Sequence, residues 1–169
     1  MIPRFIDRCR GDKGAAIVEF AIVFPVFMVI TLGMLTGGVV LTHQLSVTQA
    51  AREAARYGAT IAQEQCAPTT HCGGMTWAQL VQAIAVQRAG GDVTSAGVCV
   101  ALVSGAGGAP SAVDAAHTTA GSTAPCYVDN SADDGPRVQV SISRPDEIQM
   151  MISTIDLQLV SHATARYET

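Results

Sequence analysis

Apolar residues dominate one continuous stretch near the start of the chain. From Phe20 to Gln49 there is no Asp, Glu, Lys or Arg, and the strongly apolar part ends at about Thr42. A helix needs ~20 apolar residues to cross a bilayer, whereas the apolar core of a secretory signal is only about 7–15 residues long. The pattern therefore predicts a helix that spans a membrane over about residues 18–42.

The helical pattern continues past this apolar stretch. We expect one helix over residues 15–62, about 70 Å long at 1.5 Å per residue. Pro25 removes a backbone donor and predicts a kink near residues 21–25. Beyond the span, small residues at helical spacing form a smooth stripe, which packs either against another helix or against the protein's own sheet. This small-residue stripe consists of Ala51, Ala54, Ala55 and Gly58.

A second, shorter helix is predicted over residues 77–89. Apolar residues there, Trp77 among them, recur at i, i+3 and i+4, the spacing of one helix face. Thr76 is a suitable N-terminal cap, and Gly90 ends the helix. Trp77 is interpreted as a core residue because its spacing is that of the buried face.

The rest of the chain has strand patterns separated by polar or flexible segments. The run at 97–103 is β-branched, and the run at 137–144 alternates polar and apolar residues, so both are predicted strands. Pro145 is expected to end the second strand, with a helical turn over 146–153 and a last strand over 156–167. Residues 104–125, rich in Gly, Ala and Ser, predict a loop. The expected fold class is α+β: a long N-terminal helix, a short second helix and a small antiparallel sheet.

Charge is distributed unevenly along the 169 residues. Residues 1–14 contain four basic and two acidic side chains, a net charge of +2. Because the whole chain has a net charge of −4, the remaining residues carry −6. Basic residues before an apolar span predict that the N-terminus stays in the cytoplasm and that the rest is exported. The exported part lacks a basic patch, which argues against nucleic acid as a partner.

The five cysteines follow the same division. Cys9 lies in the cytoplasmic leader, and four cysteines lie in the exported part, an even number in an oxidising compartment. We expect Cys66–Cys72 as a small loop and Cys99–Cys126 as a clamp across a longer one. A zinc site at these cysteines is the weaker alternative because no CxxC spacing occurs.

Gly14 and Glu19 form an unusual pair at the beginning of the apolar span. A carboxylate close to the lipid core is costly unless it finds a partner. Glycine has no side chain, so an extended segment around Gly14 can closely approach a protease. This arrangement suggests a segment that is cut, with a new end that could meet Glu19. A glutamate that merely reaches the headgroups of an ordinary membrane anchor is the alternative.

These residues resemble a known family. The segment from Gly14 to Phe20 is similar to class III signal peptides, which a prepilin peptidase cuts after the glycine. The wider stretch, RCRGDKGAAIVEFAIVFPVFMVITLGML followed by QAAREAARYGAT, resembles the TadE-like proteins of tight-adherence (Flp/Tad) pili. The resemblance covers residues 8–60 well and residues 157–166 weakly.

The resemblance implies a domain plan and a pathway. Residues 1–14 would be the leader, 15–62 the long helix, and 63–169 an exported, disulfide-bearing, pilin-like domain. Glu19 and Phe20 would become the fifth and sixth mature residues and act in assembly. The implied partners are the prepilin peptidase, the major pilin and other minor pilins, the inner-membrane assembly platform and the lipid bilayer.

The size of the exported part refines the expected role. Major Flp pilins are very short chains, whereas this chain has a sizeable domain. It therefore resembles a minor pilin or pseudopilin, acting in pilus assembly, surface adhesion and biofilm formation. The implied location is the inner membrane, with the C-terminal domain in the periplasm or, after assembly, on the pilus. The alternative is an uncleaved, single-pass membrane anchor that carries an exported binding domain.

Catalytic and metal-binding chemistry have little support in the sequence. Spacing indicates no Ser-His-Asp or paired-carboxylate arrangement, so we expect no enzyme and no cofactor. The acidic residues from Asp129 to Asp134 do not match the EF-hand pattern and are interpreted as a solvated turn rather than a Ca²⁺ site. His43 is interpreted as an interfacial residue at the outer boundary of the membrane.

Overall fold

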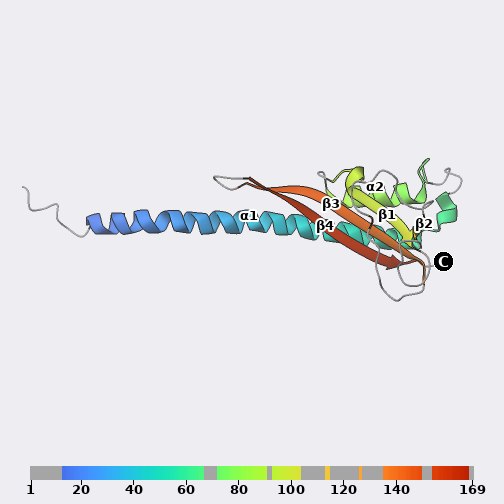
Figure 1. The fold of residues 1–169 in the computed structure, drawn as a ribbon, viewed down its shortest axis with the longest axis horizontal. Coiled ribbons are helices and arrows are strands. Elements are labelled where there is room, and N and C mark those ends of the chain that lie inside the picture. The colour runs from blue at the N-terminus through green and yellow to red at the C-terminus, as the bar shows by residue number, and fades with distance from the viewer. Residues whose placement is uncertain are drawn as a thin grey trace, which may run out of the picture. The chain divides into compact units, whose positions relative to one another are not determined.

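The computed structural model of this chain contains two helices and a four-stranded sheet (Figure 1). It describes residues 13–66, 72–90, 93–103, 113–114, 126, 135–149 and 154–167. The predicted α+β class is confirmed. The chain divides into two compact units, residues 1–39 and residues 40–169, and each unit is described by itself. The predicted leader lies outside the described residues except for Lys13 and Gly14.

The first helix, α1, comprises Lys13–Thr60 and continues without interruption through Pro25. Its apolar half also contains hydroxyl groups, which bond within the helix: Thr31 Oγ1 donates to the Phe27 carbonyl and Thr36 Oγ1 to the Leu32 carbonyl, both at 2.8 Å. Backbone carbonyls thus satisfy these hydroxyls, which makes them compatible with a surrounding that offers no water.

The second helix, α2, comprises Trp77–Ala89, the predicted bounds. It begins with a capping box, in which Thr76 Oγ1 accepts from the Gln79 backbone N–H and the Gln79 side chain accepts from the Thr76 N–H. This reciprocal arrangement satisfies two backbone donors at the helix start. A 3₁₀ helix, η1 (Gln63–Cys66), precedes α2, and another, η2 (Ser95–Gly97), follows it.

The sheet is antiparallel, with the strand order β2-β1-β3-β4. Its strands are β1 (Val98–Val103), β2 (Val113–Asp114), β3 (Arg137–Gln149) and β4 (Thr154–Arg166). The short strand β2 occurs where the sequence predicted only loop. The rest of this predicted loop, residues 104–112 and 115–125, lies outside the described residues.

The predicted end of β3 at Pro145 was wrong. The strand continues through Pro145, which is in register with Gln158 of β4, as far as Gln149. Residues 146–149 are therefore strand and not a helical turn, while 150–153 lie outside the described residues. Pairing with β1 ends at Ile142, so β3 is an edge strand at Pro145. An edge strand tolerates a residue that lacks the backbone donor.

The core lies where the second half of α1 packs with α2, β1 and β3. Val47 is the first buried residue of α1, and the whole small-residue stripe is buried in this core. At Gly58, an added Cβ would lie 3.0 Å from Val138 Cγ1, 3.0 Å from Val81 Cγ2 and 3.3 Å from the Trp77 ring. Of the two uses that the sequence left open, the stripe thus serves packing inside the protein's own domain.

Replacing Gly58 by leucine should destabilise the domain. The new side chain has no space among Val138, Val81 and Trp77, and overpacking of this kind costs roughly 3 kcal/mol. We expect the Tm of the full chain in detergent micelles, followed by circular dichroism, to fall by roughly 10–20 °C. Gln49→Leu, at an exposed position of α1, is the control. Equal Tm values for the two variants would contradict the packing described here.

Two disulfides tie the domain together in the pairing expected from the sequence. Cys66 is bonded to Cys72 and Cys99 to Cys126, with Cα atoms 5.2 Å apart in both pairs. The first closes a short loop between η1 and α2. The second anchors Cys126 to the buried strand β1, and closing a loop of this length restricts the unfolded chain.

A tyrosine from the far end of the sheet closes the end of α1. Tyr167 Oη donates to the Ile61 carbonyl at 3.1 Å and accepts from the Gln63 backbone N–H at 2.8 Å. Its ring packs edge-on against Trp77, with centroids 6.5 Å apart, and Trp77 Nε1 donates to the Gly58 carbonyl at 3.2 Å. These contacts satisfy backbone groups that the end of a helix leaves without intrahelical partners.

Candidate processing and assembly site

The expected cleavage site lies in the first turn of α1. The helix begins at Lys13, so the peptide bond between Gly14 and Ala15 is helical. Both residues are exposed, and a Cβ added to Gly14 would meet nothing within 4 Å. No packing contact among the described residues therefore requires a glycine here. The first turn of a helix has unpaired N–H groups and opens readily, which is what an extended protease substrate needs.

Glu19 lies one helical turn after Ala15. Residues four apart are neighbours on a helix surface, with about 5–6 Å between their Cβ atoms. Glu19 and Ala15 are both exposed. An α-ammonium on Ala15 would thus be near the Glu19 carboxylate of its own chain, and both groups are also accessible to a neighbouring chain. This geometry fits the predicted role of Glu19 but does not test it.

The apolar half of α1 forms an exposed surface. Phe20 is 64% exposed, and its ring packs against that of Phe24 with centroids 5.3 Å apart and ring planes tilted by 35°. By length and composition, α1 is the one helix among the described residues that is suited to crossing a membrane. Because water is a poor solvent for so much apolar surface, this half of α1 is suited to lipid or to other apolar helices.

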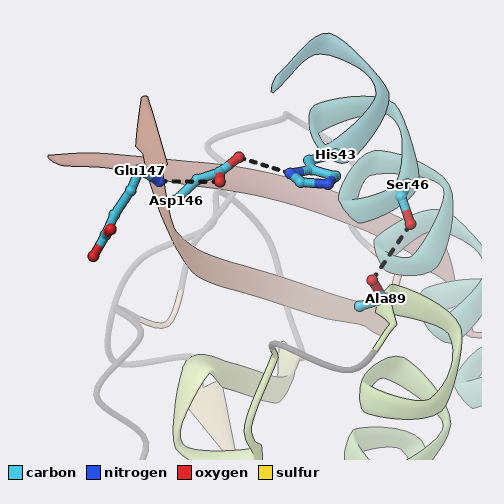
Figure 2. A network of polar contacts seen from close by, with 5 residues as sticks. All are labelled: His43, Ser46, Ala89, Asp146 and Glu147. Carbon is cyan, nitrogen blue, oxygen red and sulfur yellow. Dashed lines mark hydrogen bonds and ion pairs between the residues drawn. The ribbon is translucent and has the colours of Figure 1, made fainter. Parts of the chain in front are cut away.

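A polar contact joins α1 to β3 just after the apolar stretch. Figure 2 shows His43 and Asp146 pointing toward each other, with 2.8 Å between His43 Nδ1 and Asp146 Oδ2. The Glu147 backbone N–H donates to the other carboxylate oxygen, Oδ1, at 3.0 Å. Nearby, Ser46 Oγ donates to the Ala89 carbonyl at 3.4 Å, joining α1 to α2. His43 thus fixes β3 on α1, a role that sequence reasoning missed.

The environment of Asp146 favours its charged form. The hydrogen bond with His43 lowers the pKa of the Asp146 carboxyl below its usual value, against the opposing effect of partial burial. The Glu147 N–H and the charges of His43 and Arg144 lower this pKa further. Because the folded-state pKa is lowered, the contact stabilises the fold at pH values above about 4 and loses this effect as the pH falls through the folded-state pKa.

Asp146→Asn should therefore lower stability only where the native carboxylate is ionised. At pH 6 we expect a Tm decrease of at most about 5 °C, since the pair is partly exposed. The difference should shrink as the pH is lowered from 6 toward 2, because the native carboxyl becomes protonated as the pH falls through its lowered pKa. Asp156→Asn is the matched control, because Asp156 is exposed and paired in register with Glu147 rather than placed against His43. A Tm difference that is the same at both pH values would contradict this explanation.

The described part of the chain bears on the zinc alternative but not on the calcium alternative. Its residues contain no group of three or more His, Cys, Asp or Glu side chains able to hold a metal ion. The acidic candidates from Asp129 to Asp134 lie outside the described residues. Cys66, Cys72, Cys99 and Cys126 are all bonded in disulfides, which removes them as thiolate ligands.

Comparison with known proteins finds a match over most of α1. No curated protein and no solved structure matches the chain. The family model described as TadE-like protein matches residues 14–56. This range begins at the expected cleavage glycine, includes the apolar span and ends within the small-residue stripe. The predicted resemblance is confirmed over this range: residues 14–56 are similar to the TadE-like protein family.

Proposed function

We propose that this protein is a minor pilin or pseudopilin of a tight-adherence pilus. A prepilin peptidase cuts it after Gly14, and the mature chain then acts in pilus assembly and, through the pilus, in adhesion and biofilm formation. The role is structural and not enzymatic. The TadE-like match over residues 14–56 supports this proposal.

The division of α1 into two halves is the observation that supports the proposal most. Between residues 14 and 46 no side chain is buried, whereas the buried positions begin at Val47. One continuous helix thus offers an apolar rod at one end and a folded domain at the other. A rod of this kind is suited both to a bilayer before assembly and to packing among other apolar helices in a filament.

The proposed topology follows from charge. The basic leader remains in the cytoplasm, α1 crosses the inner membrane once, and the disulfide-bearing domain lies in the periplasm. The partners are then the peptidase at the cytoplasmic face, the assembly platform in the membrane, and the major and minor pilins in the filament. Glu19 finds the Ala15 ammonium of a neighbouring subunit or of its own chain, which penalises a wrong register.

The mature N-terminus tests the proposal directly. Intact mass and N-terminal sequencing of the protein from cells with the prepilin peptidase should show a chain that starts at Ala15. Cells without the peptidase should contain the full-length precursor. A start at Met1 or Ile2 in peptidase-positive cells would refute processing and would favour the alternative, an uncleaved membrane anchor that carries an exported binding domain.

A further inference from the structure

Strands β3 and β4 extend beyond the rest of the sheet as a two-stranded arm. Pairing of β3 with β1 ends at Val98↔Ile142, whereas pairing with β4 continues to Gln149↔Thr154. We define the arm as residues 143–149 of β3 and 154–160 of β4. Figure 1 shows these strands, in orange and red, continuing past α2 and β1. Among the described residues, the arm is therefore only two strands wide, and the Val160 carbonyl at its inner end accepts a hydrogen bond from Gln44 Nε2 of α1 at 3.4 Å.

The arm contacts the part of α1 that belongs to the same unit, residues 40–60. Ser161 Oγ donates to Thr48 Oγ1 at 3.3 Å, and Asp146, which is opposite Leu157, contacts His43. Moving outward along the arm thus corresponds to moving toward the N-terminus of α1. Ile148 lies ~7 Å beyond Asp146 along its strand, whereas Thr42 precedes His43 by only ~1.5 Å of helix.

The outer part of the arm has an apolar face. Cross-strand partners and alternate residues share a face, so Arg144 and Asp146 share their face with an apolar set. We call this set the apolar face of the arm, and Ile155 on it is 41% exposed. The opposite face has exposed Glu147, Asp156 and Gln158. The apolar face consists of Ile148, Ile155, Leu157 and Leu159.

The outermost charged residues of the two strands of the arm lie opposite each other. Glu147 and Asp156 are in register, and the sequence between them, residues 148–155, contains no charged residue. Similarly, α1 has no charged residue between Phe20 and Ala51, and its strongly apolar part ends at about Thr42. The uncharged end of the arm therefore begins close to the level at which α1 itself becomes apolar.

We propose that the uncharged end of this arm, presented by Ile148 and Ile155, inserts into the outer leaflet of the membrane that α1 crosses. The proposal rests on the membrane topology given under Proposed function. The membrane boundary lies close to the arm in this topology. The reason is that His43, which contacts Asp146 of the arm, immediately follows the apolar stretch of α1. Insertion is shallow, at the headgroup level, because the free edges of a two-stranded arm cannot be satisfied in hydrocarbon. The exported domain thus has a second membrane contact that restrains its tilt.

Site-directed fluorescence in vesicles tests this contact. The full-length chain, with Cys9→Ser and its disulfides oxidised, is reconstituted in vesicles of phosphatidylcholine and phosphatidylglycerol. The dye NBD is attached to Ile155→Cys or, in a separate protein, to Ile148→Cys. Thr164→Cys, exposed elsewhere on β4, is the aqueous control, and Leu35→Cys in α1 reports membrane insertion. The Cys9→Ser protein without an added cysteine must remain unlabelled by the dye.

We expect spin-labelled lipid to quench both arm dyes at least twofold more than the Thr164 dye, with blue-shifted emission. Water-like emission at both arm positions, with the Leu35 dye quenched by lipid, would overturn the inference and leave α1 as a membrane helix. An unquenched Leu35 dye would instead refute the proposed topology. Blue-shifted arm dyes without lipid quenching would show that protein covers the arm, which also overturns the inference.

Discussion

Gly14→Leu is expected to abolish most processing while the exported domain folds normally. A side chain at position 14 meets nothing within 4 Å in this structure, so the fold tolerates it. The peptidase, in contrast, must bring catalytic groups close to an extended backbone, and leucine obstructs that approach. Leucine also stabilises the helical first turn by about 0.8 kcal/mol relative to glycine, which opposes extension. Immunoblots should show the precursor accumulating in peptidase-positive cells.

Gly33→Leu is the matched control for Gly14→Leu. It introduces the same residue into the same helix, at a glycine whose surroundings are equally open. Processing of this control should equal that of the native chain. If the Gly14→Leu precursor were cleaved as completely as the control, the assignment of Gly14 to the cleavage site would be wrong.

Glu19→Gln is expected to impair assembly while insertion and cleavage continue. Glutamine keeps the size of the side chain but cannot pair with the ammonium that cleavage creates on Ala15. A charge left without its partner in a low-dielectric surrounding is strongly disfavoured. We therefore expect the amount of this protein that co-purifies with sheared pili to fall about tenfold or more, with an unchanged mature N-terminus.

The control for Glu19→Gln is the same change at an exposed glutamate of the domain. Glu64 lies in η1 and is exposed, so Glu64→Gln removes one charge without affecting α1. Its incorporation should match that of the native protein. Equal incorporation of the Glu19→Gln protein would remove the proposed role of Glu19 in assembly.

Local patterns predicted the helices well because their determinants are local. The bounds of α2 follow from Thr76, whose capping box with Gln79 lies within one turn. The start of the apolar helix and its continuation beyond the span were likewise readable from composition and spacing. The predicted disulfide pairing rests on the same kind of argument, because both bonds close local loops.

Features that depend on distant partners were not predictable. Whether Pro145 ends a strand depends on where β1 stops pairing with β3, which no residue near Pro145 indicates. The hydrogen bond between His43 and Asp146 joins residues 103 positions apart. No local sequence pattern around either residue predicts this contact. The choice between the two uses of the small-residue stripe could also not be made from local sequence. It depends on the sheet, because a Cβ added at Gly58 would meet Val138 of β3.

The closure of α1 by Tyr167 sets an order of events during export. Gln63 and Tyr167 are 104 residues apart, and the second half of α1 is buried against a core that includes residues of β3 and β4. Contacts between residues so distant in sequence form late in folding. In the proposed topology, residues 47–59 enter the periplasm before the strands that cover them. The part of α1 that follows the proposed membrane span therefore waits longest for its native neighbours.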